Sequence, residues 1–131
     1  MNKIILLIVI IFQSLNLLAQ KAELTSAILS FRKQDMLTSK NYILKAEQKI
    51  NEGGVLKVKD LSKLYYHKGL VLFNIYFSNI DNIDILDNLT NLDISYESFK
   101  KDVYLESSSY RDKSLIEIKR CSQSFNDLAY K

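Results

Sequence analysis

The feature that most constrains the fold is a run of apolar and aromatic residues in the middle of the chain, from Leu64 to Tyr76. Four of its residues recur at i, i+4, i+7 and i+11, the spacing of one helix face: Tyr65, Gly69, Leu72 and Tyr76. A glycine inside a helix costs about 1 kcal/mol relative to alanine, so Gly69 indicates that another helix approaches closely there. We therefore predict that this run is the central helix of an all-α fold.

The composition supports one helical domain and argues against a nucleic-acid-binding protein. The chain has 131 residues, no Pro and three Gly, which is typical of a helical rather than a loop-rich fold. Its 18 Lys+Arg and 15 Asp+Glu give a net charge of +3. Because the two signs are interleaved, the basic stripe of a nucleic-acid-binding surface is missing.

The N-terminus has the layout of a secretory signal peptide. Lys3 precedes an apolar stretch, and Ala19 is a small residue at a suitable cleavage point before Gln20. The alternative is a transmembrane anchor, but residues 4–20 are at the lower limit of spanning length and include polar residues. We predict a signal peptide at 1–19 and a domain at 20–131. The mature protein would be exported, periplasmic or secreted, with no stable membrane anchor.

Two short amphipathic segments follow and predict a first helical hairpin. One runs from Ala22 to Leu37 and the other from Tyr42 to Ile50, with a polar turn at 38–41 between them. Gly53 is placed to end the second helix in a left-handed cap.

The central helix begins a second predicted hairpin. Asp60 is a good N-cap for it, and we expect it to end near Phe77. Residues 78–91 are rich in Asn and Asp, which favour turns, so we predict a packed connection there. The partner helix is expected from Leu92 to Leu105.

A fifth helix is predicted after a serine-rich break, capped by Asp112 or Ser114. Its expected apolar stripe is Leu115, Ile118, Phe125 and Ala129. No following helix pairs with it, so its end, at Phe125 and Leu128, is expected to be left uncovered and to self-associate or bind another chain.

The second hairpin resembles a tetratricopeptide repeat (TPR). Tyr65, Gly69 and Leu72 match the first helix of that family's pattern. Ser95 and Phe99 match the small and aromatic positions of the second helix. The chain departs from the pattern at Lys68, Asp102 and Ser107, and the interval between the two helices implies an insertion. The alternative is an unrelated five-helix bundle built by the same packing rules.

The resemblance implies about two TPR-like repeats with a C-terminal capping helix, and a concave surface lined by the first helices. On the central helix that surface maps to five predicted partner-binding residues: Lys63, Tyr66, Leu70, Phe73 and Asn74. The implied function is an exported, non-catalytic scaffold that binds a partner protein or peptide. A second interpretation is that Leu70 and Phe73 pack on the connection at 80–89.

No residue pattern predicts catalysis, a metal site or a cofactor. His67 is the only His and is expected to be solvated. Cys121 is the only Cys and is read as a small core residue, with an intermolecular disulfide as the alternative. Asp81, Asp84 and Asp87 lack the spacing of a calcium loop. The alternative to a binding scaffold is a structural role, as the N-terminal part or a self-associating subunit of a larger envelope assembly.

Overall fold

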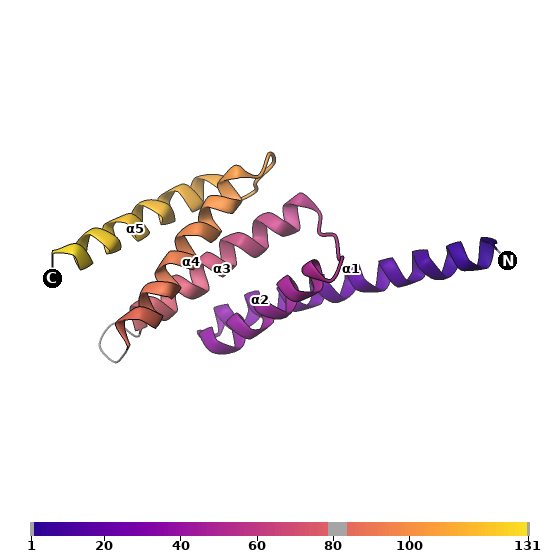
Figure 1. Ribbon diagram of the computed structural model, residues 1–131, viewed down its shortest axis with the longest axis horizontal. Helices are drawn as coiled ribbons and strands as arrows, with labels where there is room; N and C mark the ends of the chain where they lie inside the picture. The colour runs from indigo at the N-terminus through magenta and orange to yellow at the C-terminus, as the bar shows by residue number, and fades with distance from the viewer. Residues whose placement is uncertain (1, 79–83, 131) are drawn as a thin grey trace.

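The computed structural model describes residues 2–78 and 84–130, and over these residues the chain is all-helical. Its helices are α1 (Asn2–Arg32), α2 (Met36–Asn51), α3 (Val58–Ser78), α4 (Ile85–Tyr104) and α5 (Arg111–Ala129). Figure 1 shows them as a layered array with the chain termini at opposite ends of its long axis. The predicted all-α class is confirmed.

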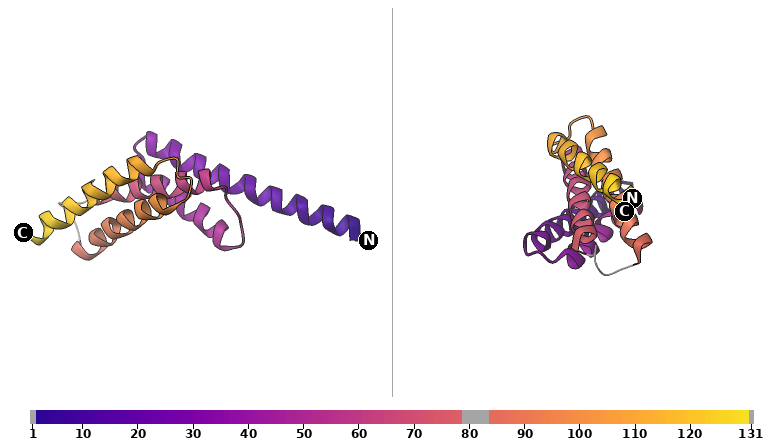
Figure 2. Two further views of the ribbon diagram at one scale, coloured as in Figure 1. Left: turned by 90° about the horizontal axis from the view of Figure 1, so that it is seen from above. Right: turned by 90° about the vertical axis from the view of Figure 1, so that its left-hand side faces the viewer.

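The central helix of the array is α3, as the sequence predicts. The end-on view in Figure 2 places it between the α1–α2 pair and the α4–α5 pair. It contributes Leu64, Val71, Leu72 and Ile75 to a core with α1 and α2, and Phe73 and Tyr76 to a second core with α4 and α5. Because α3 is apolar on nearly every side, it packs against helices on both sides. The single predicted stripe of Tyr65, Gly69, Leu72 and Tyr76 accounts for only part of this burial.

The contact expected at Gly69 is present and lies against α4. A Cβ built on Gly69 would stand 2.5 Å from the Phe99 ring, and Phe99 is fully buried. The Ser95 hydroxyl donates a 2.8 Å hydrogen bond to the Gly69 carbonyl. The α3 and α4 backbones therefore approach closely because Gly69 has no side chain and Ser95 has a short one.

The first half of α1 projects beyond the other helices (Figure 1). Its apolar side chains are exposed from Ile4, at 66%, through Phe12, at 67%. Gln20 is the first buried side chain among those that the structure describes in this helix, and Leu24 and Ala27 belong to the first core. The packed part of the helix thus starts at the position where the sequence predicts the mature chain to begin.

The predicted boundary between the first two helices is wrong. The turn lies at residues 33–35, and residues 38–41 belong to α2. Gln34 adopts a left-handed φ of 63°, and Asp35 caps α2 by accepting a hydrogen bond from the Thr38 amide. Ser39, expected in a turn, is buried and donates to the Ala27 carbonyl at 2.8 Å.

The predicted end of α2 is confirmed, whereas the predicted start of α3 is wrong. Gly53 has a φ of 99°, and the Gly53 and Gly54 amides donate to carbonyls of the last turn of α2, which is a Schellman cap. Asp60 is not the N-cap, because α3 already begins at Val58. Asp60 lies in the first helical turn, where its charge favours the helix dipole and pairs with Lys21 at 3.4 Å.

The helix α4 begins at Ile85, earlier than the predicted start at Leu92. Asp84 caps it, with its carboxylate accepting from the Leu86 amide at 3.3 Å. Much of the predicted connection is therefore the first two turns of α4. The remaining part of that prediction, at 79–83, lies outside the described residues.

The predicted apolar stripe of α5 is rotated from the true buried face. Leu115 and Ala129 are exposed, while Ser114, Cys121 and Ser124 are buried. Neither predicted cap is correct, because Tyr110 precedes the helix and both Asp112 and Ser114 lie within it. Ile118, Phe125 and Leu128 are partly buried against the second core.

A buried carboxylate joins α3, α4 and α5. Asp102 is fully buried and accepts from the hydroxyls of Ser62 at 2.5 Å, Ser108 at 2.7 Å and Ser114 at 2.6 Å. Because a buried carboxylate is tolerated only when its oxygens are hydrogen-bonded, the three serines are what permit Asp102 at this position. This cluster gives Asp102 a structural role at the contact of the three helices.

We predict that Gly69→Ala destabilises the protein even though alanine is the better helix former. The added methyl group would force the buried Phe99 ring to move, and overpacking of this kind costs about 1–3 kcal/mol. Urea unfolding of the purified protein measures the change. Asn74→Ala, at an exposed position of the same helix, is the control and should be nearly neutral. Equal unfolding midpoints for Gly69→Ala and the parent would contradict the close approach.

Candidate functional site

Of the five predicted partner-binding residues, Tyr66, Leu70 and Phe73 pack toward α4 and α5, whereas Asn74 lines a shallow pocket with residues of α1 and of the turn after it. Phe73 is only 3% exposed and belongs to the second core, which Leu70 and Tyr66 also contact. Asn74 is exposed and donates its amide to the Leu70 carbonyl at 2.7 Å, and Lys63 is half-buried. The strip therefore does not form a continuous open surface in this structure.

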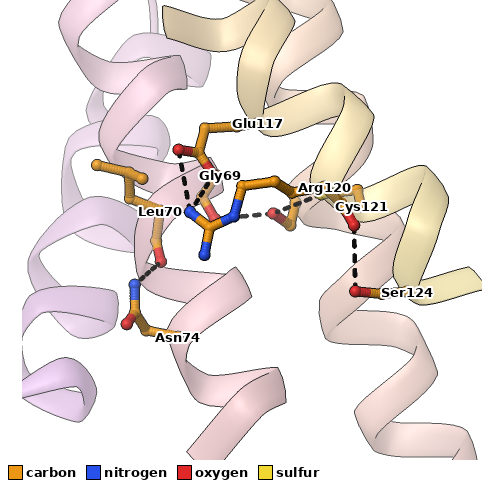
Figure 3. A network of polar contacts seen from close by, with 8 residues as sticks. Gly69, Leu70, Asn74, Glu117, Arg120, Cys121 and Ser124 are labelled. Atoms are coloured by element: carbon orange, nitrogen blue, oxygen red, sulfur yellow. Dashed lines mark hydrogen bonds and ion pairs between the residues drawn. The ribbon is translucent and has the colours of Figure 1, made fainter.

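Side chains of α5 and of the turn before it cover this strip. The Arg120 guanidinium lies over the Phe73 ring at 5.1 Å and pairs with Glu117 at 2.9 Å. Figure 3 shows Arg120 reaching from α5 toward Leu70 on α3. Tyr110 stacks on Tyr66, with ring centroids 4.6 Å apart. Of the alternative predicted cover at 80–89, residues 80–83 lie outside the described residues, and Leu89 is not among the side chains packed against the second core.

His67 is half-buried rather than solvated, which corrects the sequence-based expectation. Its ring makes edge contacts with Phe31, Tyr66 and Tyr110, and its Nδ1 lies 2.9 Å from the Lys63 carbonyl. Burial lowers the pKa of His67 from its usual value, and the nearby charges of Arg32, Lys63 and Lys113 lower it further. The imidazole is thus held in its neutral form.

Cys121 is a fully buried core residue, as predicted from its position. Its Sγ lies 3.8 Å from the Ser95 hydroxyl. Burial raises the pKa of the thiol to about 11, so the reactive thiolate is disfavoured. A disulfide to another chain would require this helix to leave the core.

An open groove with a volume of about 490 Å³ lies on the opposite side of α3. Its floor is α3, one wall is α2 and the other wall is α4. The lining residues are Leu37, Lys40, Ile43, Leu44, Lys68, Val71, Leu72, Ile75, Asp87, Thr90, Asn91 and Ile94. We call this the α2–α4 groove. Its volume is within the range of about 300–1,000 Å³ that is typical of ligand sites.

The α2–α4 groove has an apolar floor and exposed apolar rims. The floor residues Val71, Leu72 and Ile75 are almost completely buried. On the rims, Leu37 is 69% exposed and Leu44 is 49% exposed. The exposed apolar surface of the groove is therefore confined to its rim, at Leu37 and Leu44.

Charges of opposite sign stand on the two walls of the groove. Lys40 is on the α2 wall and Asp87 is on the α4 wall, and neither pairs with a charged residue that the structure describes. Lys68 at the floor is neutralised by Glu47, with its Nζ 2.7 and 2.8 Å from the two carboxylate oxygens. The site therefore presents one available cation and one available anion across an apolar floor.

Within residues 2–78 and 84–130, no group of three His, Cys, Asp or Glu side chains is placed to hold a metal ion. Asp84 and Asp87 belong to that region, whereas Asp81 lies outside it. Over the same residues, no helix combines the length and apolar character needed to cross a membrane.

The sequence contained a signal for the groove that helical periodicity on one face did not reveal. Leu37 and Leu44 are seven residues apart, on one face of α2, with Lys40 between them. That face differs from the buried face of Ser39, Ile43 and Ala46. The pair Leu37 and Leu44, which lies outside the core face of α2, is therefore the feature of the sequence that indicates a second contact surface.

Comparison with known proteins adds no further assignment, since no protein family, curated protein or solved structure matches this chain.

We predict that lowering the pH destabilises the protein partly through His67. The unfolded chain takes up a proton near the ordinary pKa of about 6.5, whereas the folded chain resists it because its pKa is lowered. Stability contributed by neutral His67 is therefore present above about pH 6.5 and is lost as the pH falls toward the lowered pKa.

Urea unfolding at about pH 7.5 and about pH 5.5 tests this, comparing the parent with His67→Gln. The chain has one His, so the difference between the two proteins isolates its effect from that of the carboxylates. The parent should lose more stability than the variant. Equal losses would contradict the prediction.

Proposed function

We propose that this chain is an exported, non-catalytic helical scaffold that binds a segment of a partner protein in the α2–α4 groove. The observation that carries the proposal is the groove itself, with exposed leucines on its rim and, on its walls, Lys40 and Asp87, which form no ion pair among the described residues. Burying a leucine contributes about 1.5–3 kcal/mol, so Leu37 and Leu44 together are a substantial driving force for association.

Export is supported by the N-terminal sequence and by where packing begins. Lys3 and the apolar stretch to Ala19 have the layout of a signal peptide. Among the side chains of α1 that the structure describes, the first buried one is Gln20, and the described members of both cores all lie after residue 19. The proposed location is the periplasm or the medium.

We propose that the second hairpin of the scaffold is TPR-like. The support for this is the close contact of Gly69 with Ser95 and Phe99. It differs from the implied arrangement in where a partner binds. The α5-facing side of α3 is covered, and the open surface is the groove between α2 and α4.

The second candidate function is a self-associating structural subunit. The observation in its favour is a pair of exposed apolar residues on α5, Leu115 at 49% and Ile116 at 62% exposure. The sequence predicts self-association through Phe125 and Leu128 instead. These two residues leave less apolar surface for such a contact, because both already pack on the second core. Phe125 makes an edge contact with Tyr96, with centroids 6.1 Å apart.

We predict that the native protein begins at Gln20. Mass spectrometry of the protein from its natural source gives the N-terminus directly. A chain that retains Met1 in the membrane fraction would show that the apolar segment is an anchor. Replacing Ala19 with a bulky residue such as Phe should block the cleavage and provides the control.

We predict that a photo-crosslinker at Leu44 captures a second protein in cells, whereas one at Ile116 does not. Both positions are exposed and apolar, so they are matched apart from their location. The adduct from position 44 should be lost when Leu37→Asp places a charge on the groove rim, and should be retained with Leu115→Asp.

Three results separate the proposals. Adducts from position 44 that survive Leu37→Asp would place the contact outside the groove. Adducts of the chain with itself, formed only from position 116, would support the structural subunit. Equal adducts from both positions would contradict both specific surfaces.

A further inference from the structure

The side-chain amide of Gln20 is buried where α1 meets the end of α2. Gln20 is fully buried, and its Nε2 donates a 3.3 Å hydrogen bond to the Lys49 carbonyl. Gly54 provides the space for this amide, because a Cβ added at position 54 would overlap it. The Gln20 Oε1 is buried without a hydrogen-bond partner among the described residues, so packing against Gly54 is a main part of what holds the amide.

Two ion pairs hold the same turn of α1 against its neighbours. Glu23 pairs with Lys49 at 2.7 Å, and Lys21 pairs with Asp60 of α3 at 3.4 Å. Ion pairs that are partly exposed contribute little individually. Together with the buried amide of Gln20, they make this turn a point of attachment between α1 and the rest of the first core.

Cleavage of the predicted signal peptide after Ala19 makes Gln20 the N-terminal residue, and an N-terminal Gln can cyclise. Its α-amino nitrogen attacks its own Cδ, a new C–N bond closes the lactam ring of pyroglutamate, and Nε2 leaves as ammonia. One proton of the α-amino group passes to the leaving nitrogen, so the reaction consumes no other reactant. The group that must react is the amide that is buried against Gly54.

The lactam and the folded contact of Gln20 exclude one another. Ring closure fixes Cδ to the α-amino nitrogen, which withdraws the amide from the Lys49 carbonyl and empties the space beside Gly54. A packed contact that is replaced by a cavity lowers stability. In the folded chain the turn must open before the ring can close, so the rate follows the small population of the open form.

We propose, on the basis of the proposed export, that Gln20 is a modification site controlled by folding. A chain that begins at Gln20 forms pyroglutamate while this turn is undocked. Once α1 packs on α2, the amide fastens the new N-terminus to the end of α2 and is no longer available for cyclisation. The folded mature protein therefore retains an open Gln20 with a free α-amino group.

The rate of ammonia loss from the purified 20–131 chain tests the proposal, once circular dichroism and cooperative urea unfolding show that this chain is folded. Intact-mass spectrometry follows the loss with time, without urea and in urea above the unfolding midpoint. The folded chain should cyclise at least about tenfold more slowly than the unfolded chain. A synthetic peptide of residues 20–30 is the control for the effect of urea on the chemistry, and its rate should change little.

A pair of variants examines the contact itself. Gly54→Ala places a methyl group where the amide lies, so it should speed cyclisation in the folded chain. Asn51→Ala changes an exposed residue of the same helix end and should leave the rate unchanged. The comparison with and without urea does not depend on either variant, so the test holds even if Gly54→Ala fails to fold.

The stability of the cyclised chain gives a second measurement. Chain cyclised in urea and then refolded should unfold at a lower urea concentration than the open chain. The difference should be smaller in Gly54→Ala, because that variant has already lost the contact.

The results that overturn the proposal are distinct from those that overturn export. Equal cyclisation rates with and without urea, or equal stability of the open and cyclised chains, would contradict the role of folding alone. A native protein that begins with pyroglutamate would show that the folded protein does not retain the open residue. A native N-terminus other than Gln20 would contradict the proposed processing, and this inference with it.

Discussion

The close approach of α3 and α4 at Gly69 is the contact on which the rest of the structure depends. The buried Phe99 ring occupies the space that a side chain at position 69 would need, and Ser95 bonds to the carbonyl beside it. Ser95 also contacts Cys121, so the same point is where α5 joins the array. Because α3 and α4 share the most extensive helix interface in the described residues, this contact determines the position of the second core relative to the first.

Buried serine side chains at the contacts between helices are the second feature that holds this fold together. Ser39, Ser62, Ser95 and Ser114 are all fully buried, each at a point where two elements meet. Ser39 and Ser95 donate across to backbone carbonyls of the facing helix. Ser62 and Ser114 satisfy the carboxylate of Asp102. A short side chain allows close packing, and its hydroxyl is not left unpaired, so these polar residues belong to the core.

These serines explain much of what could and could not be predicted from the sequence. The central helix, the all-α class and the Gly69 contact follow from strong local signals, and Gly53 marks the end of α2 because glycine favours a positive φ. The turn before α2 has the same cap geometry but uses Gln34, which carries no such signal. The buried face of α5 was misplaced because Ser114 and Ser124 read as polar surface residues. The candidate groove was missed because it needs three helices, none of which defines it alone.

The position of α5 gives a physical reason why the α2–α4 groove remains open. On one side of α3, α5 packs along α4 and covers Leu70 and Phe73. On the other side, α2 and α4 both pack on α3 but share no extensive interface with each other, so a groove is left between them above floor residues that are already buried. The chain therefore covers one apolar face of its central helix with a helix of its own. The opposite face of α3 is covered by α1 and α2, and the exposed leucines Leu37 and Leu44 stand on the groove rim above residues that are already buried.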